Sequence, residues 1–454
     1  MRPARLAFSI LSTVAGLTAQ VPDGYFVWGS FQGTAGVNGI FFSHPRDPMQ
    51  PFVAVTSLPP ALGYDPSGKR GAACVAYRKS DGALIAGERA PSGTSVDLHV
   101  LKLNGADVVF AQLFSVGTSA NVGEIPQCAI LPDGRVLLAA TDLAAGGPLS
   151  QFLTTSYNWE GVGILDTNSG GVVAVPISNL NQFPGVINGI AASKEGTTAY
   201  IANYVSATSG DLWSVPIPAG GQATKVATFP CGASNVAVDI DGTVLVTALN
   251  GPPNLFRYDP VANTTAAITT SSGALNAIAV ETVTGGYVLA TANAGTPVRS
   301  LVLLTRTGGE TVLVSPNRAT IAGIDVNPNP EAFGASSPGA GRYDWRLTPN
   351  PGGLPLVGNA GFSLTIEATT ISPSMLVLAS RRLATPITIA GVQIHTDLGS
   401  IVFSPILQAG PSMTLPLPIP ANTVLVGLPL YAQTFHLEGG ASLAASAGLE
   451  FTIL

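Results

Sequence analysis

The stretch Cys128-Ala-Ile-Leu-Pro-Asp133-Gly134 has a form that recurs along the N-terminal part of the chain. A short apolar run ends in an acidic-Gly or Gly-Gly turn, and a second β-rich run follows. The turns recur at intervals of roughly 45 to 60 residues, which is the period of four-stranded propeller blades. The other copies are Cys74-Val-Ala-Tyr to Asp81-Gly82, Gly189-Ile-Ala-Ala to Glu195-Gly196, Val236-Ala-Val-Asp-Ile-Asp241-Gly242 and Ala277-Ile-Ala-Val to Gly285-Gly286.

Composition supports the same class of fold. Charged residues make up 10% of the 454 residues, against about a quarter in an average soluble protein. Gly (52) and Pro (36) are abundant, so the chain is rich in turn formers. Many apolar residues, many turns and few charges are typical of short strands that are buried on one or both faces. We therefore predict an all-β fold.

The repeat predicts six blades. Blades two to six are expected over 70–117, 124–178, 187–229, 233–270 and 274–315. Three further strands, at 25–28, 39–42 and 52–55, have no inner strand before them. The segment 320–326 follows the last blade and can supply that missing strand, which would close the ring and remove exposed sheet edges. A count of seven would need a hidden unit in the long third blade.

The chain is expected to contain four parts. Residues 1–19 form a predicted signal peptide, because Arg2 and Arg5 precede an apolar run at 6–15 and small residues end the segment at Ala19. The propeller is expected over 20–335, a Pro/Gly/Ser-rich linker over 336–355, and an antiparallel β-sandwich over 356–454. A secreted protein without a transmembrane segment is therefore predicted, whether extracellular, periplasmic or at the cell surface.

Two regions resemble known families. Ser234-Asn-Val-Ala-Val-Asp-Ile-Asp-Gly-Thr-Val-Leu-Val246, with Asn254-Leu-Phe-Arg-Tyr-Asp-Pro260 after it, resembles a unit of the NHL-type and streptogramin-lyase-like propellers. This resemblance implies a fold and says little about function. Three C-terminal segments are similar to a β-sandwich module at the end of diverse secreted bacterial proteins: Ser412-Met-Thr-Leu-Pro-Leu-Pro-Ile-Pro420, Leu425-Val-Gly-Leu-Pro-Leu-Tyr-Ala-Gln433 and Ala447-Gly-Leu-Glu-Phe-Thr-Ile453.

A candidate ligand site follows from the order of the strands. Antiparallel pairing places the start of every inner strand on one propeller face, together with the loops at 142–157 and 204–210. Polar residues recur at these strand starts and aromatic residues lie in the two loops, a combination that is typical of ligand sites. The predicted ligand-binding residues are Glu124, Gln127, Asn188, Asn235, Asn276, Tyr157 and Tyr204.

The polar residues at the inner-strand starts form a polar ring, and two interpretations of this ring are open. Glu124 with Asn188, Asn235 and Asn276 resembles the oxygen set of calcium-dependent propeller lactonases, and Ca²⁺ prefers such ligands. Alternatively, the Asn and Gln side chains hydrogen-bond to turn backbone and to channel waters. The second interpretation is favoured because the ring holds one clear carboxylate. A lyase would need a general base near an acid, and none of the four histidines maps to the channel mouth.

Charge and cysteine content set further limits. The formal net charge is −6 and the five lysines are scattered, which argues against nucleic-acid binding. Three cysteines leave at least one unpaired. Cys74 and Cys128 open the corresponding strands of successive blades, so a disulfide in an oxidising compartment is one alternative. The other alternative, which is favoured, is that these cysteines serve as small buried apolar side chains without a disulfide.

The predicted function is that of a secreted, non-catalytic propeller that binds an unknown small molecule, glycan or protein, with no cofactor or metal. The sandwich could in addition attach the protein to the cell surface. The alternative is a calcium-dependent lactonase-like hydrolase or lyase that uses the channel mouth. No catalytic residue is assigned.

Overall fold

The computed structural model describes residues 21, 25–31, 38–43, 52–79, 81–153, 158–178, 183–239, 241–250, 252–281, 286–292, 299–305, 308–314, 320–327, 331–333, 343–346, 355, 357–368, 371–404, 406–409, 412–425, 428–438 and 442–453. The described residues are almost entirely β, as predicted, with two short 3₁₀ turns, η2 (Leu398–Ser400) and η3 (Thr423–Leu425). Within this part of the chain, no helix has the length and apolar character needed to cross a membrane.

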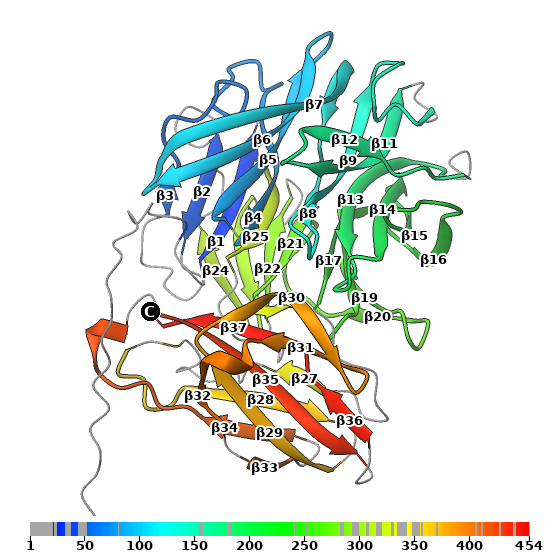
Figure 1. The fold of residues 1–454 in the computed structure, drawn as a ribbon. Coiled ribbons are helices and arrows are strands. Elements are labelled where there is room, and N and C mark those ends of the chain that lie inside the picture. Colours follow the sequence, from blue (N-terminus) through cyan, green and yellow to red (C-terminus); the bar gives the residue numbers. More distant parts are fainter. Residues whose placement is uncertain are drawn as a thin grey trace, which may run out of the picture.

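Three separate four-stranded antiparallel sheets follow one another in the middle of the chain (Figure 1). Each runs in simple sequence order, as propeller blades do. The first contains β13 (Val186–Ala192), β14 (Thr198–Ser206), β15 (Ser209–Pro216) and β16 (Thr224–Phe229). The second contains β17 (Ala233–Val238), β18 (Val244–Ala248), β19 (Leu255–Asp259) and β20 (Thr264–Ile268). The third contains β21 (Leu275–Val280), β22 (Tyr287–Thr291), β23 (Leu301–Leu304) and β24 (Glu310–Val314).

The N-terminal strands form three more groups of four, but these are hydrogen-bonded into one thirteen-stranded sheet. One group is β4 (Gly71–Arg78), β5 (Ala83–Pro91), β6 (Ser95–Asn104) and β7 (Asp107–Glu124). The next is β8 (Cys128–Ile130), β9 (Val136–Leu143), β11 (Trp159–Asp166) and β12 (Gly171–Ala174), with β10 (Phe152–Leu153) beside β11. The long β7 joins the two groups because its end pairs with both β5 and β9. The six-blade count therefore stays a prediction.

The predicted closure of the ring is confirmed. β25 (Thr320–Val326) pairs antiparallel with β1 (Phe26–Phe31), with Phe26 opposite Val326 and Phe31 opposite Thr320. β1 then pairs with β2 (Gly39–Ser43), and β2 with β3 (Val53–Ala54). A strand from the end of the propeller region thus forms the innermost strand of the first group.

Apolar clusters fill the spaces between neighbouring groups. Strand residues alternate between two such clusters, since successive side chains point to opposite faces of a sheet. Leu137 packs against the β13–β16 sheet, for example, whereas Leu138 packs against the β4–β7 group. The cluster that closes the ring contains Trp28 and Phe41 of the first group, stacked with ring centroids 4.4 Å apart, and Ala277 and Val288 of the last.

The C-terminal strands form sheets that lie apart from the blades in Figure 1. The largest has the order β26-β37-β35-β29-β32, with β33 beside β29 and β36 beside β35. It shares an apolar cluster with the β27-β28-β34 sheet, as expected of a sandwich, and the β30-β31 hairpin packs on its other face. The strands are β26 (Glu331–Phe333), β27 (Tyr343–Arg346), β28 (Ser363–Ala368), β29 (Ser372–Ala379), β30 (Arg382–Ile389), β31 (Val392–Thr396), β32 (Ile401–Phe403), β33 (Ile406–Ala409), β34 (Ser412–Pro416), β35 (Pro429–Glu438), β36 (Ser442–Ala445) and β37 (Gly448–Thr452).

Two short strands differ from the organisation expected around the linker. β26 lies within 20–335 but pairs with β37, and β27 lies within 336–355 but pairs with β28. Trp345 of β27 is buried in the C-terminal cluster and its Nε1 donates to the carbonyl of Ala447 at 2.7 Å. Pro, Gly and Ser are abundant around these strands and are typical of a linker, so neither strand is predicted from the sequence. The signal peptide at 1–19 lies outside the described residues.

Arg78, at the end of β4, connects the second and third groups on the face that carries the acidic-Gly turns. Its guanidinium forms a two-point ion pair with Asp81, with distances of 2.8 and 3.0 Å. Nη1 donates to the Gly134 carbonyl at 3.0 Å and to Thr167 Oγ1 at 2.9 Å. The Arg78 side chain is 9% exposed, whereas that of Asp81 is 34% exposed, so removal of the guanidinium loses four hydrogen bonds but leaves Asp81 accessible to water.

We expect Arg78→Met to lower the free energy of unfolding by about 1 to 3 kcal/mol, because four hydrogen bonds of a buried guanidinium are lost. Urea denaturation followed by tryptophan fluorescence measures this change. Arg135→Met is the matched control, since the side chains of Arg135 and its partner Asp133 are 35% and 51% exposed, and should cost less than about 1 kcal/mol. Equal losses of unfolding free energy in both variants would show that the hydrogen bonds of Arg78 do not hold the second and third groups together.

Candidate functional site

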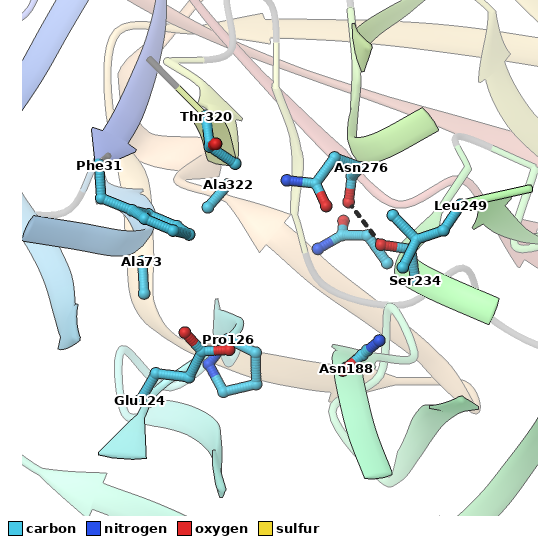
Figure 2. Close-up of a pocket in the computed structure, with 11 residues that line it drawn as sticks. Phe31, Ala73, Glu124, Pro126, Asn188, Ser234, Leu249, Asn276, Thr320 and Ala322 are labelled. Carbon is cyan, nitrogen blue, oxygen red and sulfur yellow. Dashed lines mark hydrogen bonds between the residues drawn. The ribbon is translucent and has the colours of Figure 1, made fainter. Parts of the chain in front are cut away.

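One hollow lies where the inner strands of all six groups begin (Figure 2). It has a volume of about 200 Å³. Its wall is made by the ends of β1 and β7 and by residues at the starts of the inner strands, as the predicted strand order requires. The lining residues are Phe31, Ala73, Glu124, Pro126, Asn188, Ser234, Asn235, Leu249, Asn276, Thr320 and Ala322.

The structure brings four of the seven predicted site residues together in this pocket. Glu124, Asn188, Asn235 and Asn276 all line it. Gln127 and Tyr204 are not among the lining residues, and Tyr157 lies outside the described residues.

Glycines allow the inner strands to approach one another closely. A Cβ atom on Gly189 of β13 would lie 2.9 Å from the Cα atom of Asn235 in β17. A Cβ on Gly323 of β25 would lie 2.6 Å from the Cα of Cys74 in β4. Both distances are shorter than van der Waals contact, so only glycine fits where backbones converge. The pocket is narrow for this reason.

Gln127 bridges the inner strands β13 and β17. Its Oε1 accepts hydrogen bonds from the backbone N–H groups of Ile190 (2.8 Å) and Val236 (3.2 Å), and its Nε2 donates to the Val236 carbonyl at 2.6 Å. One side chain therefore joins the third group to the fourth and fifth. The alternative in which Gln side chains bond to backbone is confirmed for Gln127, which has little capacity left for a ligand.

Asn235 and Asn276 have the same kind of role at successive blades. Asn235 Oδ1 accepts from the N–H of Ile278 in β21 at 3.3 Å. Asn276 Nδ2 donates to the carbonyl of Ile321 in β25 at 2.6 Å. Each side chain thus has one polar atom on the next inner strand. Ser234 Oγ donates to the Asn276 carbonyl at 2.9 Å, the hydrogen bond drawn in Figure 2.

Glu124 is the ionisable residue of the pocket wall. Its side chain is 28% exposed, and its Oε2 lies 3.8 Å from Nη1 of Arg89. Burial raises the pKa of this carboxyl above its usual value, Arg89 opposes that rise and Asp142 adds to it. The Arg89 guanidinium also lies over the Phe31 ring, 4.7 Å from the centroid. Arg89 was missed at the sequence level, because β-strand pairing of residues 89 and 124 brings it to the site.

Glu160, in β11, is a fully buried carboxyl that interacts electrostatically with Glu124. It is 2% exposed, and its Oε2 accepts from the backbone N–H of Ile187 at 2.8 Å. Burial raises its pKa to about 8, with Asp142 and Glu124 contributing in the same direction. A charged residue inside the apolar run Trp159-Glu-Gly-Val-Gly-Ile-Leu165 was a signal that could have found it.

The predicted loop at 204–210 is instead a tight turn. β14 and β15 pair through Tyr204 opposite Gly210 and Ser206 opposite Ser209. The Tyr204 ring packs against Gly232, where an added Cβ would overlap its Cε2 atom. Phe152, in the other loop, is buried and packs against Phe183 with centroids 5.7 Å apart. β14 continues to Ser206, although the polar residues after Tyr204 are typical of a loop.

Glu124 is the one titratable side chain among the described residues that line the pocket. Within the described part of the chain, no three His, Cys, Asp or Glu side chains are grouped so that they could hold a metal ion. His99 lies elsewhere, buried in β6, with its Nε2 3.1 Å from Glu88 Oε2. The backbone N–H of Gly242 donates to the Asp239 carbonyl at 2.9 Å, a hydrogen bond typical of a turn.

We expect Gln127→Ala to lower the free energy of unfolding by about 2 to 4 kcal/mol, because three backbone groups near the axis lose their partner. Thermal and urea denaturation measure the loss. The control is Asn188→Ala at the same face, which should change stability by less than about 1 kcal/mol. If Gln127→Ala were as mild as the control, its hydrogen bonds would not be holding the inner strands.

Glu160 predicts a specific pH dependence. The folded protein retains a proton on Glu160 between pH 4.5 and about 8, where the unfolded chain releases it. Its contribution to stability is therefore fully present below pH 4.5 and is lost as the pH rises towards 8. Glu160→Gln should remove this slope and gain a few kcal/mol at pH 8 or above. Urea denaturation at pH values from 5 to 9 measures this dependence of the free energy of unfolding. Glu195→Gln, at an exposed position, is the control. Parallel curves for wild type and Glu160→Gln would show that Glu160 is ionised throughout.

Comparisons with known proteins show distant likeness only. No family model matches the chain, and no curated protein matches it. A putative 6-phosphogluconolactonase from Bacteroides uniformis is 10% identical, with a TM-score of 0.41, over 65% of this chain and 97% of that one. A putative TolB from Agrobacterium tumefaciens is 15% identical, with a TM-score of 0.39, over 56% of this chain and 84% of that one. A streptogramin B lyase is 13% identical, with a TM-score of 0.36, over 69% of this chain and 81% of that one. With such low scores, the argument for a propeller rests on the strand pairings described above.

Proposed function

We propose that this chain is an exported, six-bladed propeller that binds a small hydroxyl-rich ligand in its central pocket and does not catalyse a reaction. The observation that carries this proposal is the composition of the pocket wall. It combines one carboxylate, several amide and hydroxyl groups, and an aromatic ring in a hollow of about 200 Å³. Adjacent donors and acceptors beside an aromatic ring suit a polyol or sugar of monosaccharide size.

The charge at the pocket narrows the ligand class. Glu124 has one cation, Arg89, at 3.8 Å, which is longer than a close charge-assisted hydrogen bond. A ligand that donates to Glu124 through a hydroxyl or ammonium group can therefore improve the pairing of this carboxylate. A strongly anionic ligand would meet the same carboxylate unfavourably. Neutral sugars and amino sugars are the preferred class, either free or at the end of a glycan.

Calcium-assisted hydrolysis is less well supported. Asn235 already uses its side-chain oxygen for the Ile278 N–H, and Glu124 is the single carboxylate among the lining residues. A Ca²⁺ ion needs six to eight oxygens, usually with more than one carboxylate. General acid–base chemistry likewise requires a second titratable group within reach of the substrate. The pocket is better suited to holding a ligand than to transforming it.

The proposal is tested by calorimetric titration and thermal denaturation of the full chain with D-glucose, D-glucosamine and CaCl₂. We expect saturable binding of at least one sugar, weakened about tenfold or more by Glu124→Gln because a charge-assisted hydrogen bond is lost. Glu195→Gln, at an exposed position far from the pocket wall, should bind like the wild type.

The other outcomes reject the proposal. Absence of sugar binding, or binding that Glu124→Gln leaves unchanged, would exclude this pocket as a sugar site. Saturable calcium binding that raises the melting temperature and is lost in Glu124→Gln would favour the lactonase-like alternative instead. Export is tested separately, by whether residues 1–19 are missing from the N-terminus of the mature protein.

A further inference from the structure

Two thiols meet at the contact between the second and third groups of strands. Cys74 lies in β4 and Cys128 opens β8, the inner strands of these groups. Their Sγ atoms are 3.3 Å apart, and the residues are only 1% and 5% exposed. Both cysteines are free thiols in the structure. In the described residues β8 pairs with β9 alone, so no backbone ladder joins the two strands that carry the thiols.

The surroundings hold Cys74 in this position. Gly87 lies opposite Cys74 in the β4–β5 pair, and a Cβ on Gly87 would be 2.6 Å from Cys74 Sγ. On the other side, Gly323 packs against the Cys74 backbone. The sulfur therefore occupies space that any larger residue at 87 would fill. A disulfide needs the two sulfurs to approach to about 2.05 Å with suitable Cβ directions, and from 3.3 Å this requires a small side-chain adjustment.

We propose that Cys74 and Cys128 are an oxidation site that forms an intrachain disulfide between neighbouring inner strands. The oxidant is a low-molecular-weight disulfide such as glutathione disulfide. One deprotonated cysteine attacks a sulfur of the oxidant and releases one thiol, which leaves a mixed disulfide on the protein. The second cysteine, also deprotonated, attacks the protein sulfur and releases the second thiol. Two cysteine thiols are oxidised and one oxidant disulfide is reduced to two thiols.

Burial decides when this exchange takes place. The thiolate is the reacting form, and the pKa of Cys128 is raised by the hydrogen bond with Cys74 and by burial. Exchange in the closed protein is therefore slow, and the bond forms while the contact between β4 and β8 is still open during folding. Once the ring has closed, the same burial protects the bond from reductants. Cys231 is also buried and its pKa is raised to about 11, but no second thiol faces it.

The bond would join two parts of the pocket wall. Ala73 and Pro126 line the pocket, and they lie one and two residues before Cys74 and Cys128. A covalent link at this level closes a loop of the unfolded chain and should therefore stabilise the folded state. This inference depends on the geometry of the thiols alone and does not require the proposed ligand.

Alkylation and mass analysis test the proposal. The full chain is refolded with a mixture of reduced and oxidised glutathione, then denatured in excess iodoacetamide and weighed intact. We expect one alkylated cysteine per chain, and a proteolytic peptide pair joined through Cys74 and Cys128. The oxidised protein should melt about 5 to 10 °C above the dithiothreitol-reduced protein, as loop closure in the unfolded state predicts.

Matched variants separate this bond from other cysteine chemistry. Cys231→Ala should keep the cross-link and become fully resistant to alkylation after oxidation. Cys74→Ala and Cys128→Ala should each lose the link and the difference in melting temperature between oxidised and reduced samples. Three alkylated cysteines in oxidised wild type, or a cross-link that includes Cys231, would overturn the proposal. The wild-type comparison remains decisive even if a variant fails to fold.

Discussion

The structure depends on the burial of both faces of every blade between two neighbours. A four-stranded sheet whose residues are apolar on both faces cannot be stable alone in water, because one or both faces would remain exposed. Leu137 and Leu138 illustrate this, since they are adjacent in sequence but contribute to different inter-blade clusters. The last sheet must therefore meet the first group, which β25 completes by pairing with β1, and the cluster that contains Trp28 and Val288 makes this contact.

Ring closure creates a second requirement near the axis. The inner edge of each inner strand has no neighbouring strand, so its N–H and C=O groups need other partners. Polar side chains from preceding blades provide them: Gln127 for Ile190 and Val236, Asn235 for Ile278, and Glu160 for Ile187. Much of the polar ring is thus part of the architecture. The capacity for a ligand is concentrated at Glu124, at Asn188 and at the amide groups that these hydrogen bonds leave free.

Much of the fold could be predicted from the repeat. The inner strands, the closing role of 320–326 and the gathering of Glu124, Asn188, Asn235 and Asn276 at one face all follow from antiparallel order in a repeated unit. Arg89 could not be placed, because its distance from Glu124 depends on the register of β5 and β7. The polar residues after Tyr204 predict a loop, although pairing of β14 with β15 continues beyond it. β26 and β27 were concealed by Pro, Gly and Ser around them.

The sequence by itself determined the fold class and the face on which polar residues gather, because alternation and turn chemistry are local properties that repeat from blade to blade. Only the tertiary structure decided what those residues do. Whether an Asn oxygen is available to a ligand depends on a backbone N–H from another blade, about forty residues away in the chain. Cys74 and Cys128 are 54 residues apart in the chain, and their sulfur atoms lie 3.3 Å apart. Only the packing of β4 against β8 in the folded protein brings them together.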